Sequence, residues 1–135
     1  MKKIIIAYLA TGATFIACDS VWLTITASRL YKAELGALML DDFVMAPAVA
    51  FYLLYWVGIV VFAVLPGLAA RRWQATTWRG ALLGLVAYAT YDLTNQATMR
   101  GWSSVVTVAD LIWGTLLTAT AATVGYLVTR RLTPR

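Results

Sequence analysis

The chain has 135 residues, of which 61% are hydrophobic and 13% charged, and its formal net charge is +5. A soluble domain is nearer a quarter charged, so this composition is typical of a membrane protein. One cysteine and no histidine exclude an internal disulfide framework and argue against zinc and haem sites. The sequence also lacks the glycine-rich phosphate loops of nucleotide-binding proteins. We therefore expect neither a cofactor nor a resident metal.

Hydropathy divides the chain into four apolar segments, each long enough to cross a bilayer as a helix. They cover about residues 4–27, 43–65, 80–99 and 105–128. Pro47 falls in the first turns of the second segment, where a helix tolerates proline. Pro66-Gly67 is a strong breaker pair and is expected to end that helix. The sequence predicts an all-α membrane protein, with four transmembrane helices packed as a compact bundle in a single domain, 1–135.

The stretch from Ser28 to Asp42 is too polar to remain in the hydrocarbon core. Its apolar residues recur at helical spacing: Tyr31, Leu35, Leu38 and Met39. This pattern suits a short interfacial helix between the first two spans. An ordered loop is the alternative.

The basic residues are distributed unequally between the two sides of the predicted bundle. Eight lie on the side of the termini and of the 66–79 turn: Lys2, Lys3, Arg71, Arg72, Arg79, Arg130, Arg131 and Arg135. Three lie on the other side: Arg29, Lys32 and Arg100. The positive-inside rule therefore predicts a multi-pass protein of the bacterial inner membrane with both termini cytoplasmic. This distribution explains the basic balance without nucleic acid as a partner.

The third span contains a polar stretch, residues 88–99, with one carboxylate and two amides. Residues three and four apart share a helix face. The side chains on that face are Tyr88, Asp92, Asn95 and Gln96. A carboxylate at the centre of a membrane helix costs about 2.5–3.5 kcal/mol on insertion scales. Partners on other helices must offset that cost.

Two further carboxylates and a phenol are expected at a similar depth. Counting 1.5 Å per residue, Asp19, Tyr52, Asp92 and Asp110 all lie roughly 8–13 Å below the outer helix ends. Asp19 and Asp110 each stand three residues before a tryptophan, Trp22 and Trp113, so both pairs follow a D-x-x-W pattern. Agreement in depth between separate helices predicts a polar layer in the outer half of the membrane.

We predict a pocket around these acids with aromatic walls. Its candidate ligand-binding or proton-carrying residues are Asp19, Asp92, Asp110, Asn95, Gln96, Tyr52, Tyr55, Tyr88, Tyr91, Trp22 and Trp113. Desolvation and mutual repulsion both favour the neutral form of a carboxyl. We therefore expect at least one of the three acids to be protonated at neutral pH, with the three titrating as a coupled set.

Each acid also has a structural interpretation. Asp19 could be bonded to threonine or tyrosine hydroxyls on neighbouring helices, and Asp92 could hold helices together with the amides beside it. Asp110 could pair with Arg100 near the membrane surface. Three unpaired intramembrane acids would cost roughly 8–10 kcal/mol, about the stability of a whole domain. This cost favours a polar cavity over packing alone.

The chain resembles a family of small bacterial four-helix integral membrane proteins, domain of unknown function 2177, over nearly its whole length. The resemblance is carried by Asp19-x-x-Trp22, Asp42-Phe43 with Pro47, Tyr91-Asp92-Leu93-Thr94-Asn95, Arg100-Gly101-Trp102 and Asp110-x-x-Trp113-Gly114. It implies the four-helix membrane architecture and no particular chemistry.

The function that these features favour is binding or carrying a small or amphipathic ligand, lipid-like or cationic, in a carboxylate-containing pocket, with proton coupling as an extension. One alternative is an intramembrane lipid-modifying enzyme, in which Asp19 and Asp92 transfer protons while Asn95 or Tyr52 holds an oxyanion. The other alternative is a structural or accessory subunit of a larger membrane complex. The sequence leans away from an enzyme. Besides the lipid bilayer, a second copy of the chain or another membrane protein could be a partner.

Overall fold

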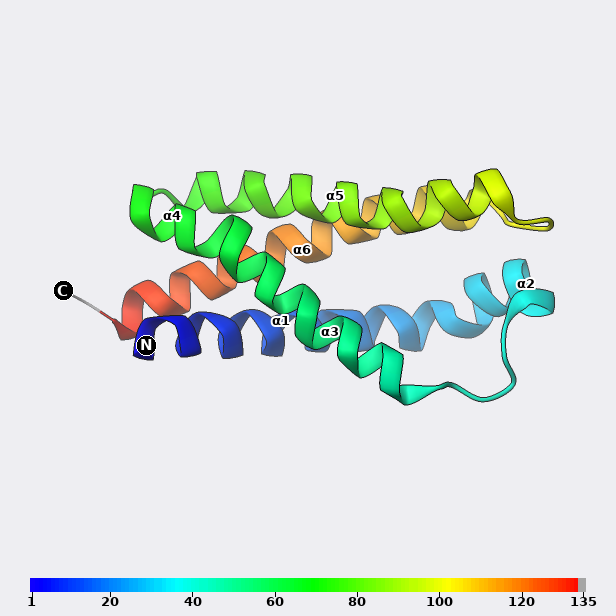
Figure 1. Ribbon diagram of the computed structural model, residues 1–135, viewed down its shortest axis with the longest axis horizontal. Coiled ribbons are helices and arrows are strands. Elements are labelled where there is room, and N and C mark those ends of the chain that lie inside the picture. Colours follow the sequence, from blue (N-terminus) through cyan, green and yellow to red (C-terminus); the bar gives the residue numbers. More distant parts are fainter. Residues whose placement is uncertain (134–135) are drawn as a thin grey trace.

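The computed structural model describes residues 1–133, which form four long helical rods (Figure 1). The first rod comprises α1 (Lys2–Thr26), a π-helical turn η1 (Ala27–Tyr31), α2 (Lys32–Leu35) and a 3-10 turn η2 (Gly36–Leu38). The second comprises α3 (Met45–Ile59), a π-helical turn η3 (Val60–Val64) and α4 (Leu65–Ala70). The other two are α5 (Trp73–Thr98) and α6 (Ser104–Leu132).

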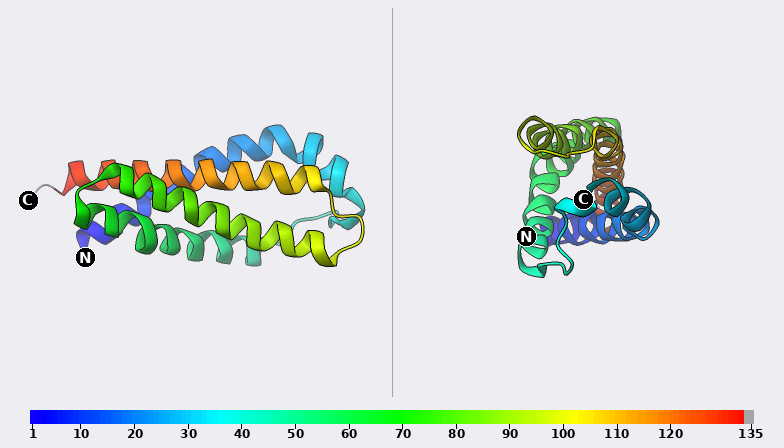
Figure 2. Two further views of the ribbon diagram at one scale, coloured as in Figure 1. Left: turned by 90° about the horizontal axis from the view of Figure 1, so that it is seen from above. Right: turned by 90° about the vertical axis from the view of Figure 1, so that its right-hand side faces the viewer.

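The rods run side by side and form a four-sided bundle when seen from one end (Figure 2). α5 and α6 form an antiparallel hairpin with the most extensive contact in the bundle, although they diverge at the C-terminal end of α6 (Figure 1). α1 packs against α6, and α3 packs against α1. Contacts of the second rod with α5 come mainly from η3 and α4, so α3 and α5 diverge towards the other end (Figure 1). The N-terminus, the turn at Arg71 and the end of α6 share one end of the bundle, opposite the 39–44 and 99–103 connections.

Three of the rods are long and apolar enough to cross a membrane: Lys2–Leu38, Met45–Ala70 and Ser104–Leu132. α5 is of comparable length but carries more polar residues, among them Arg79, Asp92 and Asn95. Because α5 packs closely on α6, the all-α bundle of four helices is confirmed, with α5 as its most polar member.

The second rod continues through Pro66-Gly67, so the expectation that this pair ends the helix was wrong. Proline in a regular helix clashes with the carbonyl four residues earlier. Here the regular α-helix is interrupted by the π-helical turn η3, which ends at Val64, so Pro66 falls in the first turn of α4, where proline is tolerated. Gly67 is needed for packing, since a Cβ there would lie 1.6 Å from Thr76 Oγ1 on α5. The rod ends instead at Arg71, which adopts the left-handed conformation with φ 55°.

The segment 28–42 is helical only in its first part, and there it continues the first rod. Neither a separate interfacial helix nor a simple loop describes it, because η1, α2 and η2 follow α1 without a break as far as Leu38. An extended connection then leads to α3. Tyr31 is the last residue of the π-helical turn η1.

The last two helices are longer than the hydropathy predicts. α5 begins at Trp73 and α6 ends at Leu132, so Arg79, Arg130 and Arg131 lie on helices rather than in connections. Arg135, which the sequence counts among the basic residues at this end, lies outside the described residues. Between the two helices, Gly101 takes a positive φ of 76°. Ser103 Oγ then caps α6 by accepting hydrogen bonds from the backbone N–H groups of Val105 and Val106.

Glycines bring α5 and α6 into backbone contact. A Cβ at Gly84 would lie 2.1 Å from the carbonyl oxygen of Gly114, and one at Gly114 would lie 2.2 Å from the ring of Tyr88. Small residues at membrane helix interfaces permit such approach, and the gain is van der Waals packing. At Gly84 and Gly114 the hairpin therefore has no room for a larger side chain.

We expect Gly84→Ala to lower the free energy of unfolding by about 1–3 kcal/mol, because backbone must move to admit the methyl group. Gly58→Ala on α3 is the matched control: nothing lies within 4 Å of a Cβ there, and alanine favours the helix by about 1 kcal/mol. Thermal unfolding of the two variants in detergent tests this difference. Equal stability of the two would contradict the packing described for the hairpin.

Candidate functional site

Asp19 of α1 is held by hydrogen bonds from two other helices. Tyr52 on α3 donates its hydroxyl to Oδ2 at 2.6 Å, and Trp113 on α6 donates its indole N–H to Oδ1 at 3.1 Å. The Asp19 side chain is buried, with 7% of the residue exposed. Both carboxyl oxygens therefore have a donor, and Asp19 joins α1, α3 and α6 at one level.

Trp22, one turn further along α1, continues this network towards Asp110. Its indole ring stacks on that of Trp113, with centroids 4.6 Å apart and planes within 6°. Trp22 Nε1 donates to the hydroxyl of Tyr31 at 2.9 Å, and that hydroxyl donates to Asp110 Oδ1 at 2.5 Å. The sequence suggested Arg100 as the partner of Asp110. The structure gives it Tyr31 instead, which the π-helical turn η1 brings across to α6.

Asp92 on α5 is the exception among the three acids. It is completely buried, and among the described residues no hydroxyl or N–H group donates a hydrogen bond to either of its carboxyl oxygens. It lies beside Asp110 at the interface of α5 with α6. An unsatisfied buried polar group is costly, more so when it carries a charge. The burial of Asp92 without a hydrogen-bond donor therefore needs an explanation.

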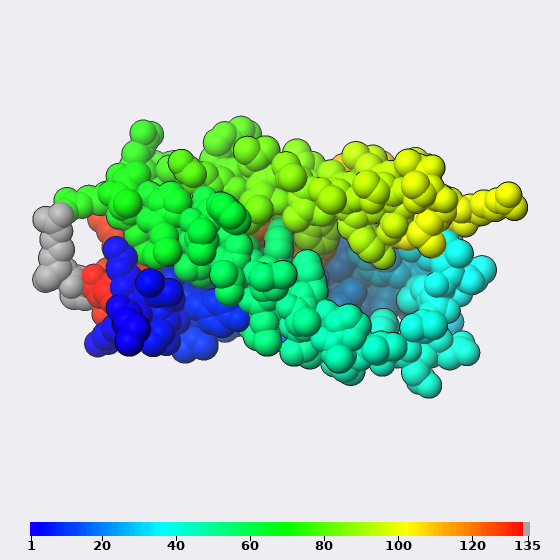
Figure 3. Space-filling view, viewed as in Figure 1, coloured from blue at the N-terminus to red at the C-terminus, as the bar shows by residue number. Residues whose placement is uncertain are grey.

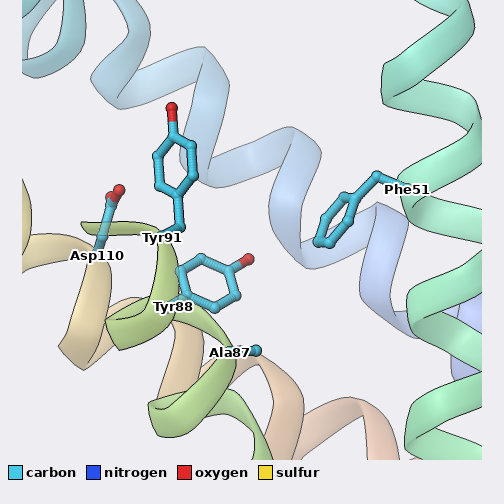
Figure 4. A pocket seen from close by; sticks show the side chains of 5 residues that line it. All are labelled: Phe51, Ala87, Tyr88, Tyr91 and Asp110. Carbon is cyan, nitrogen blue, oxygen red and sulfur yellow. The ribbon is translucent and has the colours of Figure 1, made fainter. Parts of the chain in front are cut away.

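A cavity of about 370 Å³ opens beside Asp110. It is lined by Phe51 from α3, Ala87, Tyr88 and Tyr91 from α5, and Asp110 from α6 (Figure 4). Phe51 lies across the cavity from the two tyrosines, and Asp110 supplies the charged group of the lining (Figure 4). The molecular surface is hollowed between α3 and α5, where atoms of α1 are visible behind (Figure 3). The volume of the cavity lies within the range of small-molecule pockets, about 300–1,000 Å³.

The predicted site residues are divided between this cavity, the network beside it and the bundle ends. Tyr88, Tyr91 and Asp110 line the cavity. Tyr55 lies deeper, with its hydroxyl bonded to that of Thr118 at 2.8 Å. Gln96 is exposed and donates to Ser104 Oγ at 3.0 Å, near the 99–103 connection, so the structure does not bring it into the cavity. Asn95 is half-buried one turn beyond Tyr91.

Sequence reasoning missed three residues of the site. Ala87 and Tyr91 are four apart, as are Phe51 and Tyr55, so helical periodicity could have placed Ala87 and Phe51 beside the predicted tyrosines. The sequence places Tyr31 in a segment expected to be either a short interfacial helix or an ordered loop, and only the observed continuation of the first rod places it against Asp110. No sequence pattern predicts a π-helical turn at that position.

The chemistry available differs among the three acids. The enzyme alternative requires Asp19 as a general acid or base, but both of its oxygens accept hydrogen bonds from Tyr52 and Trp113. Asp110 has one oxygen bonded to Tyr31 and borders the cavity. Within residues 1–133, no group of three or more His, Cys, Asp or Glu side chains is placed to hold a metal ion. Asp110 is thus the acid best placed to meet a ligand.

Tyr52→Phe tests the structural role of Asp19. Loss of the hydroxyl leaves Asp19 Oδ2 without its donor, so we expect the free energy of unfolding to fall by about 1–3 kcal/mol. Tyr88→Phe is the control, because the Tyr88 hydroxyl forms no hydrogen bond with the described residues and its ring packing is kept. Thermal unfolding in detergent separates the two. A Tyr52→Phe protein as stable as Tyr88→Phe would show that Asp19 does not need this donor.

Comparison with known proteins places this architecture in a family. Neither the curated proteins nor the solved structures contain a match to the chain. The family model described as predicted membrane protein, domain of unknown function 2177, matches residues 4–127. That match includes most of every rod and all residues of the Asp19 network and of the cavity lining. The chain is a member of this family of membrane proteins.

Proposed function

We propose that the protein binds an amphipathic cation in the cavity between α3 and α5, in the outer half of the bacterial inner membrane. The observation that carries this proposal is the composition of the cavity: one carboxyl group, three aromatic rings and an opening to the side of the bundle. Transport of the bound ligand would be an extension of the same binding site.

The direction of the opening favours a ligand that arrives from the lipid. α3 exposes large apolar side chains along its length, among them Val49, Leu53 and Leu54, and these would face hydrocarbon in a bilayer. The cavity opens between that helix and α5, rather than at the end of the bundle (Figure 3). A molecule with an apolar body could therefore enter without leaving the membrane.

The charge of the lining favours a cation. Asp110 is its only ionisable carboxyl, and no basic side chain lines the cavity among the described residues, so an anionic head group would have no counter-charge there. The faces of Phe51, Tyr88 and Tyr91 can attract a cation through their quadrupoles. Asp19 is engaged with Tyr52 and Trp113, which leaves Asp110 as the anchor.

Tetraphenylphosphonium and tetraphenylborate are probes of the same shape and opposite charge. We expect the purified protein in neutral detergent to bind the phosphonium, measured by equilibrium dialysis against protein-free micelles, and to bind the borate at least about tenfold more weakly. Asp110→Asn should weaken phosphonium binding by about tenfold or more, because a carboxylate–cation contact is lost from a site of low polarity. Equal binding of the two probes would contradict a cation site.

A second pair of variants tests the place of binding without changing charge. Ala87→Phe fills the cavity, whereas Val86→Phe adds the same ring at the adjacent position, where the side chain is 55% exposed. We expect Ala87→Phe to abolish phosphonium binding and Val86→Phe to leave it within about twofold of the wild type. If both variants bind normally, the ligand site is elsewhere.

The orientation proposed for the bundle places both termini in the cytoplasm, in accordance with the basic residues at that end. Single cysteines in a Cys18→Ala background test it. Leu40→Cys lies in the 39–44 connection and Arg72→Cys in the turn at the opposite end. In intact bacterial cells, a membrane-impermeant maleimide should label Leu40→Cys and not Arg72→Cys, and lysis should expose the latter. The reverse pattern would refute the orientation.

A further inference from the structure

The proposed function leaves one feature without a role, the unpartnered carboxyl of Asp92. The residue is fully buried, and no hydroxyl or N–H group among the described residues donates a hydrogen bond to its oxygens, so the carboxyl of Asp110 is the one polar side chain placed to share a proton with it. It is adjacent to Tyr91 in sequence and beside Asp110 in space, and both of these residues line the cavity. Asp92 itself does not line the cavity, so a bound ligand would meet Asp110 first, with Asp92 behind it.

The groups that face this pair of acids are acidic or neutral. Around Asp110 they are Asp19 from α1, Tyr31 from η1, and Tyr88, Tyr91 and Asp92 from α5. Around Asp92 they are Asp110 from α6 and its neighbour Tyr91. Two adjacent carboxyls in a site of low polarity, with no cationic side chain beside them, repel each other when both are ionised. One proton kept on the pair removes that repulsion.

We propose that the pair Asp92–Asp110 exchanges its proton for the charge of a cation bound in the cavity. When the cation approaches Asp110, an O–H bond of the pair breaks and the proton leaves to solvent. The electron pair stays on the carboxylate, which then faces the cation without a covalent bond. This inference rests on the proposed function and adds to it a competition between proton and ligand for one site.

The geometry gives the three acids different tasks. Asp110 borders the cavity and contacts the ligand, and its Oδ1 is held in position by Tyr31. Asp92 lies behind it as a positioning residue that shares the proton with Asp110 in the absence of ligand, so it needs no other hydrogen-bond donor. Asp19 is saturated by its two donors and takes no part in the exchange.

Proton release on binding is the direct test. Wild-type protein in weakly buffered detergent near neutral pH is titrated with tetraphenylphosphonium, and a pH indicator dye reports the protons released. We expect about one proton for each cation bound. Tetraphenylborate, which has the same shape and the opposite charge, should release none. Binding of the phosphonium without proton release would overturn the inference while leaving the proposed function intact.

The Asp92→Asn variant tests whether the released proton comes from the Asp92–Asp110 pair. The amide keeps the shape of the side chain and leaves Asp110 as a single carboxylate, so the variant should bind the phosphonium and release few or no protons. Proton release unchanged from the wild type would show that the proton comes from another group. Failure of the wild type to bind the phosphonium at all would instead refute the proposed function, and the exchange with it.

The wild type also provides a test that does not depend on a folded variant. If one proton leaves for each cation that binds, the affinity for the phosphonium must rise with pH, by up to about tenfold per pH unit over the range in which the pair is protonated. The sign follows because protons compete with the cation, and fewer protons favour binding. An affinity independent of pH between weakly acid and weakly alkaline conditions would contradict the exchange.

Discussion

Two hydrogen bonds accepted by Asp19 hold α1, α3 and α6 together in the half of the bundle opposite the termini. A carboxyl group on a membrane helix is costly unless neighbouring helices supply donors. Tyr52 and Trp113 supply them from α3 and α6, and both donors are fixed in depth and direction by their helices. Of the two contacts, the one with Tyr52 matters more for the cavity, because α3 packs mainly on α1. The bond from Tyr8 to the carbonyl of Leu53 and the approach of Trp56 to Gly12 hold the same two helices together further along.

In the two D-x-x-W patterns, the tryptophan of each pattern is linked to the aspartate of the other. Trp113 of the second pattern donates to Asp19 of the first, and Trp22 of the first reaches Asp110 of the second through the hydroxyl of Tyr31. The two indole rings stack between these contacts. Since α1 and α6 run in opposite directions, spacing Asp and Trp by one turn on each helix allows each tryptophan to approach the acid of the other (Figure 1). Tyr31, the last residue of the π-helical turn η1, provides the link between Trp22 and Asp110.

The sequence predicted the helices and the polar layer better than it predicted the contacts within that layer. Hydropathy and depth counting placed Asp19, Tyr52 and Asp110 at one level because rise per residue is nearly constant in helices. Partners depend on rotation about the helix axes and on local winding, which a hydropathy pattern does not contain. Thus Tyr31 took the place expected for Arg100, and the helix continued through Pro66 because a π-helical turn precedes it. The cavity was expected around all three acids, but Asp19 is saturated and Asp92 lies behind the wall, so Asp110 alone reaches the lining.

The cavity is a consequence of how closely α5 approaches α6. Gly84 and Gly114 allow the two backbones to meet, and the same contact buries Asp92 between them. Because α5 packs on α6, and α3 is held on α1 by the contact between Tyr52 and Asp19, a space remains between α3 and α5. Tyr88 and Tyr91 then project from α5 into the space between the two helices, opposite Phe51 (Figure 4). The glycines of the hairpin and the contacts of Asp19 therefore act together. The glycines bring α5 close to α6, Asp19 keeps α3 on α1 and apart from α5, and the Asp92 carboxyl lies at the α5–α6 contact, behind the cavity wall.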